Sequence, residues 1–415
     1  MDDPGLSDLM ATPQQVGLSA EGLAQIAHTA ERFVAEGRLA GATTIVARHG
    51  RVAHLATCGL MDLDAKRPMS ADAIFRIYSM TKPVAAAAVM MLREAGQIDL
   101  DAPVAEYLPE FGGMQAVVEP DVDPIVEIAA EREISVRDLL RHTSGLPGAN
   151  RYIGGSTAVD RLYRRHGLDR FEDGDLAAMV AKLGRIPLLY QPGRKWHYSI
   201  AADVLGRLIE VVSGRGFDEF LAERIFAPLA MVDTAFYVPA QKLDRLVGMY
   251  GPDEGGRLQP IDAPQGGTGV FSADAFTSNP SFLSAGGGLV STAADFTRFC
   301  LMLSNKGELA GTRLLQTESI EEMTRNQLPP ELIPLDKEPA ERYGGLGFGL
   351  GVSVRVEQTD WVPASQVGEY GWIGGTSTEF WIAPQAELAV VALAQHIPFS
   401  RLTEVVKPLV YAALP

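Results

Sequence analysis

Apolar residues recur at helical spacing in the first part of the chain. Ser19, a residue type that favours the start of a helix, precedes the repeat, and Gly37 follows it. We therefore expect a helix whose apolar face is formed by Leu23, Ile26, Ala27, Ala30, Phe33 and Val34. Two runs rich in β-branched residues, 42–48 and 51–56, lie on either side of a two-residue turn at 49–50. This arrangement predicts a β-hairpin.

The carboxyl-terminal part of the chain has a similar pattern. Short apolar or alternating runs at 348–355, 379–383 and 387–394 predict strands, and Ser400 precedes a last helical repeat. The apolar face of that last helix consists of Leu402, Val405, Val406, Leu409 and Val410. Because both ends of the chain supply strands and a helix, we expect one antiparallel sheet that carries the two terminal helices on one face.

The middle of the chain is dominated by helical patterns, which lie at 83–94, 135–141, 174–183 and 201–213. The sequence thus predicts an α+β protein. Residues 13–78 and 284–415 form a discontinuous sheet domain, residues 79–283 form a mainly helical domain, and an active site lies between them. Residues 1–12 have no apolar repeat and are expected to form a mobile tail. The stretch 328–339, with four prolines, is a candidate lid, and a plain surface loop fits equally well.

Composition narrows the possible functions. The chain of 415 residues has 47% hydrophobic and 21% charged residues, which is enough apolar surface for a sizeable core. Its formal net charge of −16 argues against nucleic acid and anionic membranes as partners, because both require a basic surface. The two cysteines cannot form a disulfide framework, and no Cys/His cluster has metal-ligand spacing. The amino terminus lacks the features of a signal peptide, and no apolar run is as long as a membrane span. We expect a cytoplasmic protein that acts on a small molecule without a cofactor or metal.

One short motif indicates chemistry. Ser79-Met80-Thr81-Lys82 precedes an alanine-rich helical stretch, so Ser79 lies near the amino terminus of the helix and Lys82 projects from the same face. A lysine amine held beside a serine hydroxyl can accept its proton. The motif alone is weak evidence, because about one match is expected by chance in a chain of this length. A serine that starts a helix before an exposed lysine is also common.

Further segments make the motif specific. Tyr198 precedes a predicted helix, and an aromatic-x-Gly-Gly run at 372–375 precedes a predicted strand. Together with 139–147 and 286–295, these segments resemble the serine β-lactamase and penicillin-binding protein superfamily, and more closely its class C β-lactamase-like family VIII carboxylesterases. The resemblance extends from about Val16 to the carboxyl terminus. It implies the β-lactamase/DD-peptidase-like fold, in which a second, mostly helical domain accompanies the sheet.

The resemblance implies a role for each of these residues. Ser79 would be the nucleophile that becomes acylated, Lys82 its base or electrostatic partner, and Tyr198 the phenol that carries protons to and from it. The backbone N–H groups of Ser79 and Gly375 would form the oxyanion hole. Gly374 and Gly375 would let a carbonyl group approach the strand edge, and a strand bulge is the alternative reason for them. Whether Lys82 or Tyr198 removes the proton from Ser79 stays open.

Two departures from the lactamase pattern bear on the substrate. The second motif of lactamases usually ends in Asn, whereas Ser199 and Ile200 follow Tyr198 here. The third motif usually offers Lys or another cationic or polar residue, whereas this chain has Trp372. Trp372 removes a cation suited to the carboxylate of a β-lactam and supplies an apolar wall to the substrate. We therefore expect a serine carboxylesterase that hydrolyses uncharged, short-chain acyl esters through an acyl-enzyme on Ser79.

Other functions stay open at this point. A β-lactamase or DD-peptidase-type hydrolase, an acyltransferase on the same scaffold, and a catalytically silent protein that binds acyl groups or peptides all fit the motifs. The Gly-x-Ser-x-Gly nucleophile elbow of the α/β-hydrolases does not occur in the sequence. We interpret His396 as a loop histidine, and His142 and Ser144 as parts of a structural turn. His197 is a weaker candidate for contact with the substrate.

Overall fold

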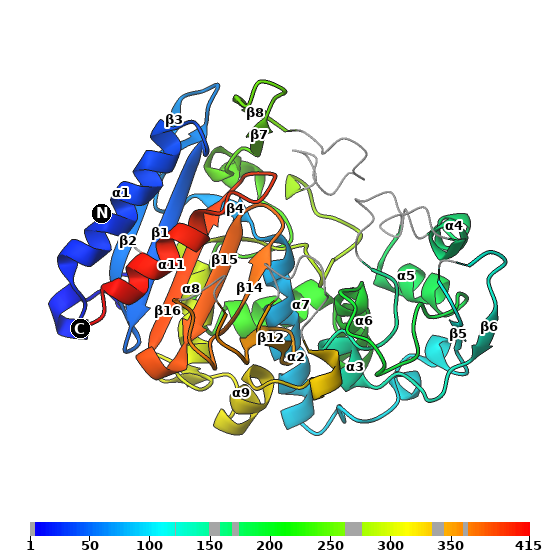
Figure 1. Ribbon diagram of the computed structural model, residues 1–415. Helices are drawn as coiled ribbons and strands as arrows, with labels where there is room; N and C mark the ends of the chain where they lie inside the picture. The colour runs from blue at the N-terminus through cyan, green and yellow to red at the C-terminus, as the bar shows by residue number, and fades with distance from the viewer. Residues whose placement is uncertain are drawn as a thin grey trace.

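The computed structural model describes residues 5–120, 122–148, 158–167, 174–261, 276–333, 344–359 and 364–415. Its largest element is an eight-stranded antiparallel sheet with the strand order β12-β13-β14-β15-β16-β1-β2-β3 (Figure 1). These strands are β1 (Gly41–Arg48), β2 (Arg51–Asp62), β3 (Arg67–Pro68), β12 (Leu346–Phe348), β13 (Ser353–Arg355), β14 (Tyr370–Gly374), β15 (Thr378–Ala383) and β16 (Leu388–Ala394). The sheet is therefore assembled from both ends of the chain, as the sequence predicts.

A tight turn connects the first two strands. His49 and Gly50 both have positive φ angles, 53° and 72°, which a two-residue hairpin turn requires when it matches the twist of the strands. On its other edge β1 pairs with β16, from Ala42 opposite Ala394 onward. The predicted hairpin is confirmed, and it joins the two halves of the sheet near its middle.

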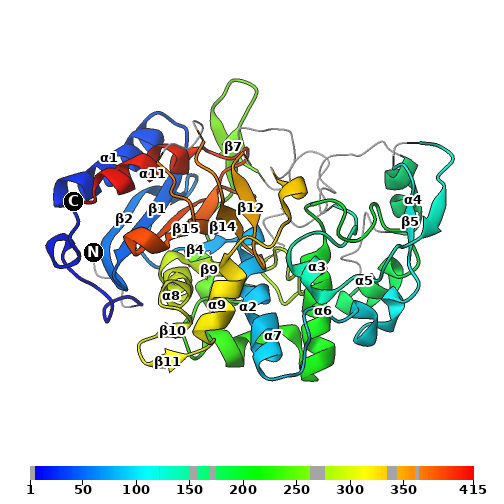
Figure 2. The ribbon, with the colours of Figure 1, turned by 60° about the horizontal axis from the view of Figure 1, so that its bottom comes forward.

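Helices cover both faces of the sheet. On one face α1 (Ala20–Ala35) and α11 (Leu402–Ala412) lie side by side, as the sequence predicts (Figure 1). On the other face α8 (Ala293–Ser304) packs against β16 and β1 (Figure 2). The core beneath α1 and α11 includes Leu23, Ile26, Phe33, Val46, Trp381, Val390 and Val406. Burial of each such side chain contributes about 1.5–3 kcal/mol, so this core holds the two terminal helices on the sheet.

A second group of helices packs beside the sheet. Its members are α2 (Thr81–Glu94), α3 (Val136–Leu140), α4 (Ala158–Arg165), α5 (Leu176–Leu183), α6 (Ala201–Ser213) and α7 (Phe217–Leu221). Helix α2 lies between the sheet and helices α3, α4, α5 and α6 (Figures 1 and 2). Its alanine run at 85–88 is buried, and these small side chains let α6 pack closely against it. The predicted domain boundaries at 78/79 and 283/284 stay predictions.

The described part of the chain also contains four two-stranded sheets of short strands and one further α-helix. Strand β4 (Ile74–Arg76) pairs with β9 (Val290–Thr292), and this pair leads into the candidate site. The other strands and α-helix are β5 (Gln115–Val117), β6 (Glu127–Ala129), β7 (Tyr250–Pro252), β8 (Leu258–Pro260), β10 (Glu308–Leu309), β11 (Thr312–Arg313) and α9 (Thr317–Thr324).

The prediction of a single strand over 348–355 is wrong. The segment is divided between β12 and β13, which form a hairpin around residues 349–352. A Cβ atom at Gly349 would lie 2.1 Å from the carbonyl oxygen of Met323, and one at Gly351 would lie 2.4 Å from the Cβ of Ala86. The chain turns here because only glycine can pass so close to its neighbours.

The mobile tail is also a wrong prediction from residue 5 onward. Leu6 and Leu9 are buried in a second core, which includes Phe296 of α8, and Asp8 forms an ion pair with Arg298. Two apolar residues are too few to produce a periodic pattern, so this packing leaves no mark in the sequence.

At the other end of the chain, the last helix has Arg401 rather than Ser400 at its cap position.

The candidate lid at 328–339 is only partly described. Pro330–Leu332 form a single 3-10 turn, and residues 334–339 lie outside the described residues. No helix in the part of the chain that the structure describes is both long and apolar enough to span a membrane. The cytoplasmic location stays a prediction.

Candidate active site

Ser79 lies at a junction between strand and helix. Strand β4 leads into the 3-10 turn η2 (Tyr78–Met80), and α2 starts directly after this turn. Tyr78 has a φ of +42°, which is strained for a bulky residue, and its ring packs edge-on against Phe276 at 5.7 Å. Ser79 is partly exposed, whereas the residues before and after it are buried. The strained turn therefore presents the Ser79 hydroxyl to solvent from an otherwise buried segment.

Lys82 projects from the first turn of α2 toward Ser79. Its side chain is only 4% exposed, and its Nζ lies 3.1 Å from Ser79 Oγ. The same Nζ donates a hydrogen bond of 2.5 Å to the carbonyl oxygen of Gly286. This carbonyl holds the amine beside the serine hydroxyl, and burial strengthens both interactions because the surroundings have a low dielectric constant.

Tyr198 reaches Ser79 from a distant part of the sequence. It lies just before α6, and its hydroxyl donates to Ser79 Oγ at 2.7 Å. Lys82 Nζ lies 4.7 Å from the centre of the Tyr198 ring. The serine hydroxyl thus has two groups within hydrogen-bond distance, and either could take its proton when deprotonated. The structure brings the three residues together, and their catalytic roles stay predictions.

An aromatic cluster holds the Tyr198 ring in place. The ring centre lies 4.9 Å from that of His142, 5.6 Å from that of Trp372 and 6.4 Å from that of Trp196. Phe348 packs against all three of these neighbours at 5.2–5.7 Å. Contacts on several sides restrict the rotation of the ring, so the phenol stays directed at Ser79.

His142 is a residue of the site whose role sequence reasoning missed. It is buried, and its Nδ1 lies 3.3 Å from both the backbone nitrogen and the hydroxyl of Ser199. Burial, with the nearby charge of Lys82, lowers the pKa of His142 well below its usual value. His142 is therefore neutral at pH 7 and serves as an aromatic neighbour of Tyr198. Its place in the segment 139–147 is the only signal in the sequence, and that signal indicates a turn rather than a site.

Asp203 is a second residue that the sequence did not reveal. It lies in the first turn of α6 and is buried. Its carboxylate accepts hydrogen bonds from Ser284 Oγ at 2.7 Å and from the backbone nitrogen of Gly286 at 2.8 Å. Because the carbonyl of Gly286 binds Lys82, Asp203 fixes the segment that holds the lysine. Acidic residues are common in the first turn of helices, so the position alone carries no signal.

Gly374, the last residue of β14, lies close to the segment before Ser79, and Gly375 follows it. A Cβ atom at Gly374 would lie 2.1 Å from Thr378 Oγ1 and 2.4 Å from the carbonyl oxygen of Ile77, so only glycine fits. Gly375 is exposed, and a Cβ there would meet no atom of the described residues within 4 Å. Strand β14 also packs against the turn η2. The open space at Gly375 leaves room for a substrate carbonyl, and the oxyanion hole stays a prediction.

The close packing at Gly374 leads to a stability prediction. We expect Gly374→Ala to lower the free energy of unfolding by about 1–3 kcal/mol, because the new methyl group must displace backbone. Gly375→Ala is the matched control and should change that free energy by less than about 0.5 kcal/mol. Thermal or denaturant unfolding of the two variants measures the difference. Equal stabilities would contradict the close approach of β14 to Ile77.

The ring of Trp372 packs against that of Tyr198, with 5.6 Å between the ring centres. Trp372 is 5% exposed, and its indole nitrogen is buried without a hydrogen-bond partner among the described residues. Trp372 therefore presents little surface to solvent, and the apolar wall expected from the sequence supports the phenol more than it faces the open part of the site. Gly374 is likewise buried. Direct contact of either residue with a substrate stays a prediction.

His396 and His197 have neighbours other than Ser79. His396 is buried just after β16, where its backbone nitrogen donates to the carbonyl of Thr376 at 3.1 Å. It supports the turn that follows Gly375. The ring of His197 lies 5.3 Å from that of Tyr190, and its contact with substrate stays a prediction. In the described ranges, no group of three or more His, Cys, Asp or Glu side chains is placed to hold a metal ion.

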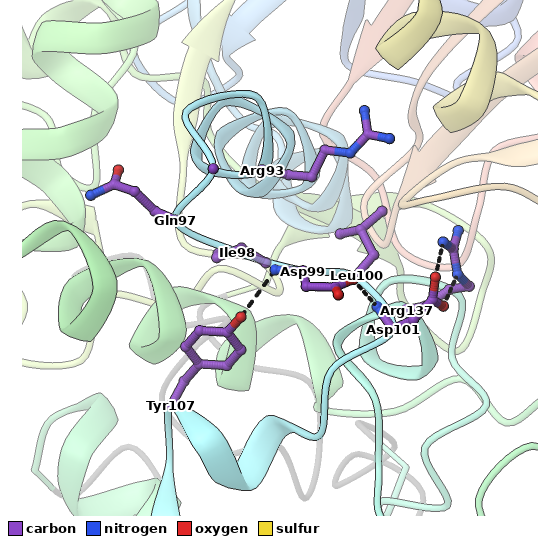
Figure 3. Close-up of a pocket in the computed structure, with 9 residues that line it drawn as sticks. Arg93, Gln97, Ile98, Asp99, Leu100, Asp101, Tyr107 and Arg137 are labelled. Atoms are coloured by element: carbon purple, nitrogen blue, oxygen red, sulfur yellow. Dashed lines mark hydrogen bonds and ion pairs between the residues drawn. The ribbon is translucent and has the colours of Figure 1, made fainter.

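A separate surface pocket of about 440 Å³ lies at the far end of α2 (Figure 3). Its lining residues include Arg93, Asp99, Asp101, Tyr107 and Arg137. The two arginines already have acidic partners, because Arg137 binds Asp101 and Glu322, and Arg93 binds Glu322. Since α2 has 14 residues, about 20 Å of helix separates this pocket from Ser79. The pocket is therefore not part of the Ser79 site.

Comparisons with known proteins agree with the fold. The family model described as Beta-lactamase matches residues 26–404. The chain is 35% identical over 367 residues to Protein Rv1367c of Mycobacterium tuberculosis, covering 87% of each chain. It is 35% identical over 275 residues to Esterase EstB of Burkholderia gladioli, covering 65% of this chain and 66% of the esterase. Its fold matches the solved structure of "EstCE1, a hydrolase with promiscuous acyltransferase activity" with a TM-score of 0.77, at 26% identity and covering 94% and 99% of the two chains.

The chain belongs to the beta-lactamase family. The predicted β-lactamase/DD-peptidase-like fold is confirmed, and so is the resemblance to the β-lactamase-fold esterases of family VIII. The fold and the relatives define the class of protein as a hydrolase or acyltransferase on a β-lactamase scaffold.

Proposed function

We propose that the protein is a serine carboxylesterase that hydrolyses short-chain acyl esters through an acyl-enzyme on Ser79. The position of Ser79 Oγ carries the proposal, because it lies 3.1 Å from Lys82 Nζ and 2.7 Å from the Tyr198 hydroxyl. A hydroxyl so placed can lose its proton as it attacks a carbonyl carbon. The relative named Esterase EstB supports esters as the substrate class.

Acylation follows from this geometry. Ser79 Oγ attacks the ester carbonyl carbon, and its proton passes to the Lys82 amine or the Tyr198 phenolate. The carbonyl oxygen becomes an oxyanion, which the backbone N–H groups of Ser79 and Gly375 stabilise. The bond between the carbonyl carbon and the alcohol oxygen then breaks. The group that took the proton returns it to the departing alcohol.

Deacylation uses the same residues with water as the attacking group. Water adds to the acyl carbon, and its proton passes to the base. The bond from the acyl carbon to Ser79 Oγ breaks, Ser79 regains a proton and the acid leaves. Lys82 remains beside Ser79 in both halves of the reaction, because the Gly286 carbonyl holds its amine.

The substrate is proposed to be a small, uncharged ester. Trp372 stands where lactamases have a cationic or polar residue, so this position offers no cation to a carboxylate.

The net charge of −16 disfavours nucleic acid and anionic membranes as partners. We propose that the protein acts in the cytoplasm on a small molecule and needs no cofactor.

Acyl transfer to an alcohol is the second candidate function. The structural neighbour EstCE1 is a hydrolase with promiscuous acyltransferase activity, and this chain shares its fold with a TM-score of 0.77. In such a reaction an alcohol takes the place of water and attacks the same acyl-enzyme. The two functions therefore differ only in the acceptor.

A comparison of substrates tests the proposal. We expect turnover of p-nitrophenyl butyrate to exceed turnover of a chromogenic cephalosporin by about 10²-fold or more. Comparable turnover of both would favour a β-lactamase. With an alcohol added, more new ester than free acid would favour an acyltransferase. No turnover of either substrate, and no labelling of Ser79 by a phosphonate, would favour a silent binding protein.

Trp372 gives a prediction about substrate preference. We expect Trp372→Lys to lower kcat/KM for p-nitrophenyl butyrate by about tenfold or more, since an ammonium would replace the ring that packs against Tyr198. The same change should improve binding of ligands that carry a carboxylate. Trp372→Phe is the control and should keep the ester preference. An unchanged preference in the lysine variant would show that Trp372 does not set selectivity.

A further inference from the structure

The side-chain amide of Gln395 joins two segments that are distant in sequence. Gln395 follows β16 directly and is 3% exposed. Its Oε1 accepts a hydrogen bond of 3.1 Å from the backbone nitrogen of Arg76, and its Nε2 donates to the carbonyl oxygen of Arg76 at 3.1 Å. The same Nε2 donates to Thr376 Oγ1 at 2.9 Å and to the Ala394 carbonyl at 3.0 Å. The amide therefore forms hydrogen bonds with both backbone polar groups of Arg76 and with the side chain of Thr376.

The two segments are the ones that lead to the oxyanion hole of the proposed function. Arg76 is the last residue of β4, three positions before Ser79, and Thr376 directly follows Gly375. Other side-chain links between these segments are longer. Thr376 Oγ1 lies 3.4 Å from the carbonyl oxygen of Arg76, and Thr378 Oγ1 lies 3.4 Å from that of Ile77. The hydrogen bonds of Gln395 to Arg76 and Thr376, at 2.9–3.1 Å, are shorter than both of these contacts.

Neighbouring contacts make this link rigid. The backbone nitrogen of His396 donates to the Thr376 carbonyl at 3.1 Å, and Ser377 Oγ donates to the His396 carbonyl at 3.0 Å. The turn after Gly375 is thereby fixed to the end of β16, which also carries Gln395. A buried amide that makes several such bonds is costly to disturb, because each lost partner leaves a buried polar group unsatisfied.

We propose that Gln395 is a positioning residue that sets the separation between the backbone N–H groups of Ser79 and Gly375. This inference rests on the proposed function, in which those two groups stabilise the oxyanion. Such stabilisation depends on donors that are fixed before the reaction, and a displacement of about 1 Å in a catalytic group can lower the rate about 10²-fold. Gln395 acts through Arg76 and Thr376 and does not itself contact the substrate.

The test uses Gln395→Met, which keeps the length of the side chain and removes its polar atoms. We expect kcat/KM for p-nitrophenyl butyrate to fall about 10–100-fold, with KM within about threefold of wild type. Affinity for a trifluoromethyl ketone should fall by a similar factor as kcat/KM, because its adduct with Ser79 carries the oxyanion. A loss of stability alone, with inhibitor affinity and kcat per folded enzyme unchanged, would overturn the proposal.

Two further variants separate positioning from folding. Tyr411→Phe is the control, because Tyr411 lies on α11, which covers the face of the sheet opposite α8, and its hydroxyl donates a hydrogen bond of 2.5 Å to Glu369. It should lower the unfolding temperature and leave inhibitor affinity unchanged. Thr376→Val removes only the contact with Gln395 and Arg76, so it provides the test if Gln395→Met does not fold. It should lower the affinity for the ketone by a larger factor than it raises KM for the ester. Equal factors for the affinity and for KM would count against a positioning role.

The wild-type enzyme separates this inference from the proposed function. If wild type neither hydrolyses the ester nor binds the ketone, the proposed function fails. If wild type does both and Gln395→Met behaves like Tyr411→Phe, only the positioning role fails.

Discussion

Replacement of Ser79 by alanine is expected to lower kcat/KM for p-nitrophenyl butyrate by at least about 10⁴-fold, because the variant cannot form an acyl-enzyme. The fold should tolerate the change. Ser79 is partly exposed, and its loss should alter the free energy of unfolding by no more than about 1 kcal/mol. Steady-state kinetics measures the loss of activity. Mass spectrometry after phosphonate treatment should show a covalent adduct on wild type and none on the variant.

Ser319→Ala is the matched control for this experiment. Ser319 is a buried serine on α9 that accepts a hydrogen bond from Arg93, at the end of α2 that is distant from Ser79. We expect this variant to keep both its activity and its labelling by the phosphonate. If Ser79→Ala retained more than about 1% of the activity and carried the label elsewhere, another residue would be the nucleophile.

Local patterns predicted the local parts of the structure well. The helix α6 spans 201–213 as predicted, and the hairpin turn at 49–50 was identified from its residues. The contact between Ser79 and Lys82 also follows from local spacing, because residues three apart share one side of a helix. By contrast, Tyr198 is 119 positions from Ser79, and no spacing rule places it there. Only the resemblance to a known family supplied that expectation.

The supporting residues of the site could not be predicted from patterns. His142, Asp203 and Gln395 matter because of contacts across 57, 83 and 319 positions of the chain, and each is an ordinary residue in its own segment. The same reason explains the errors in the fold. The strand predicted at 348–355 is broken by the close approach of Gly349 to Met323, and such an approach is visible only once the chain is folded.

Tyr198→Phe is expected to lower kcat for the ester by about 10²–10⁴-fold, with KM changed by less than about threefold. The variant loses the hydroxyl that donates to Ser79 Oγ at 2.7 Å. The ring should keep its contacts with His142 and Trp372, so the site stays packed. Rapid mixing measures acylation as the first release of p-nitrophenol. Mass spectrometry of the acyl-enzyme measures deacylation separately.

Comparison with Lys82→Met then distinguishes the two candidate bases. If Lys82 removes the proton from Ser79, Tyr198→Phe should still form the acyl-enzyme and hydrolyse it slowly, whereas Lys82→Met should not form it at any pH. If Tyr198 is the base, acylation itself should fail in Tyr198→Phe. The Lys82 variant should then still form the acyl-enzyme at a reduced rate, because it keeps the Tyr198 phenol. Wild-type rates of both steps in Tyr198→Phe would show that the phenol takes no part in the reaction.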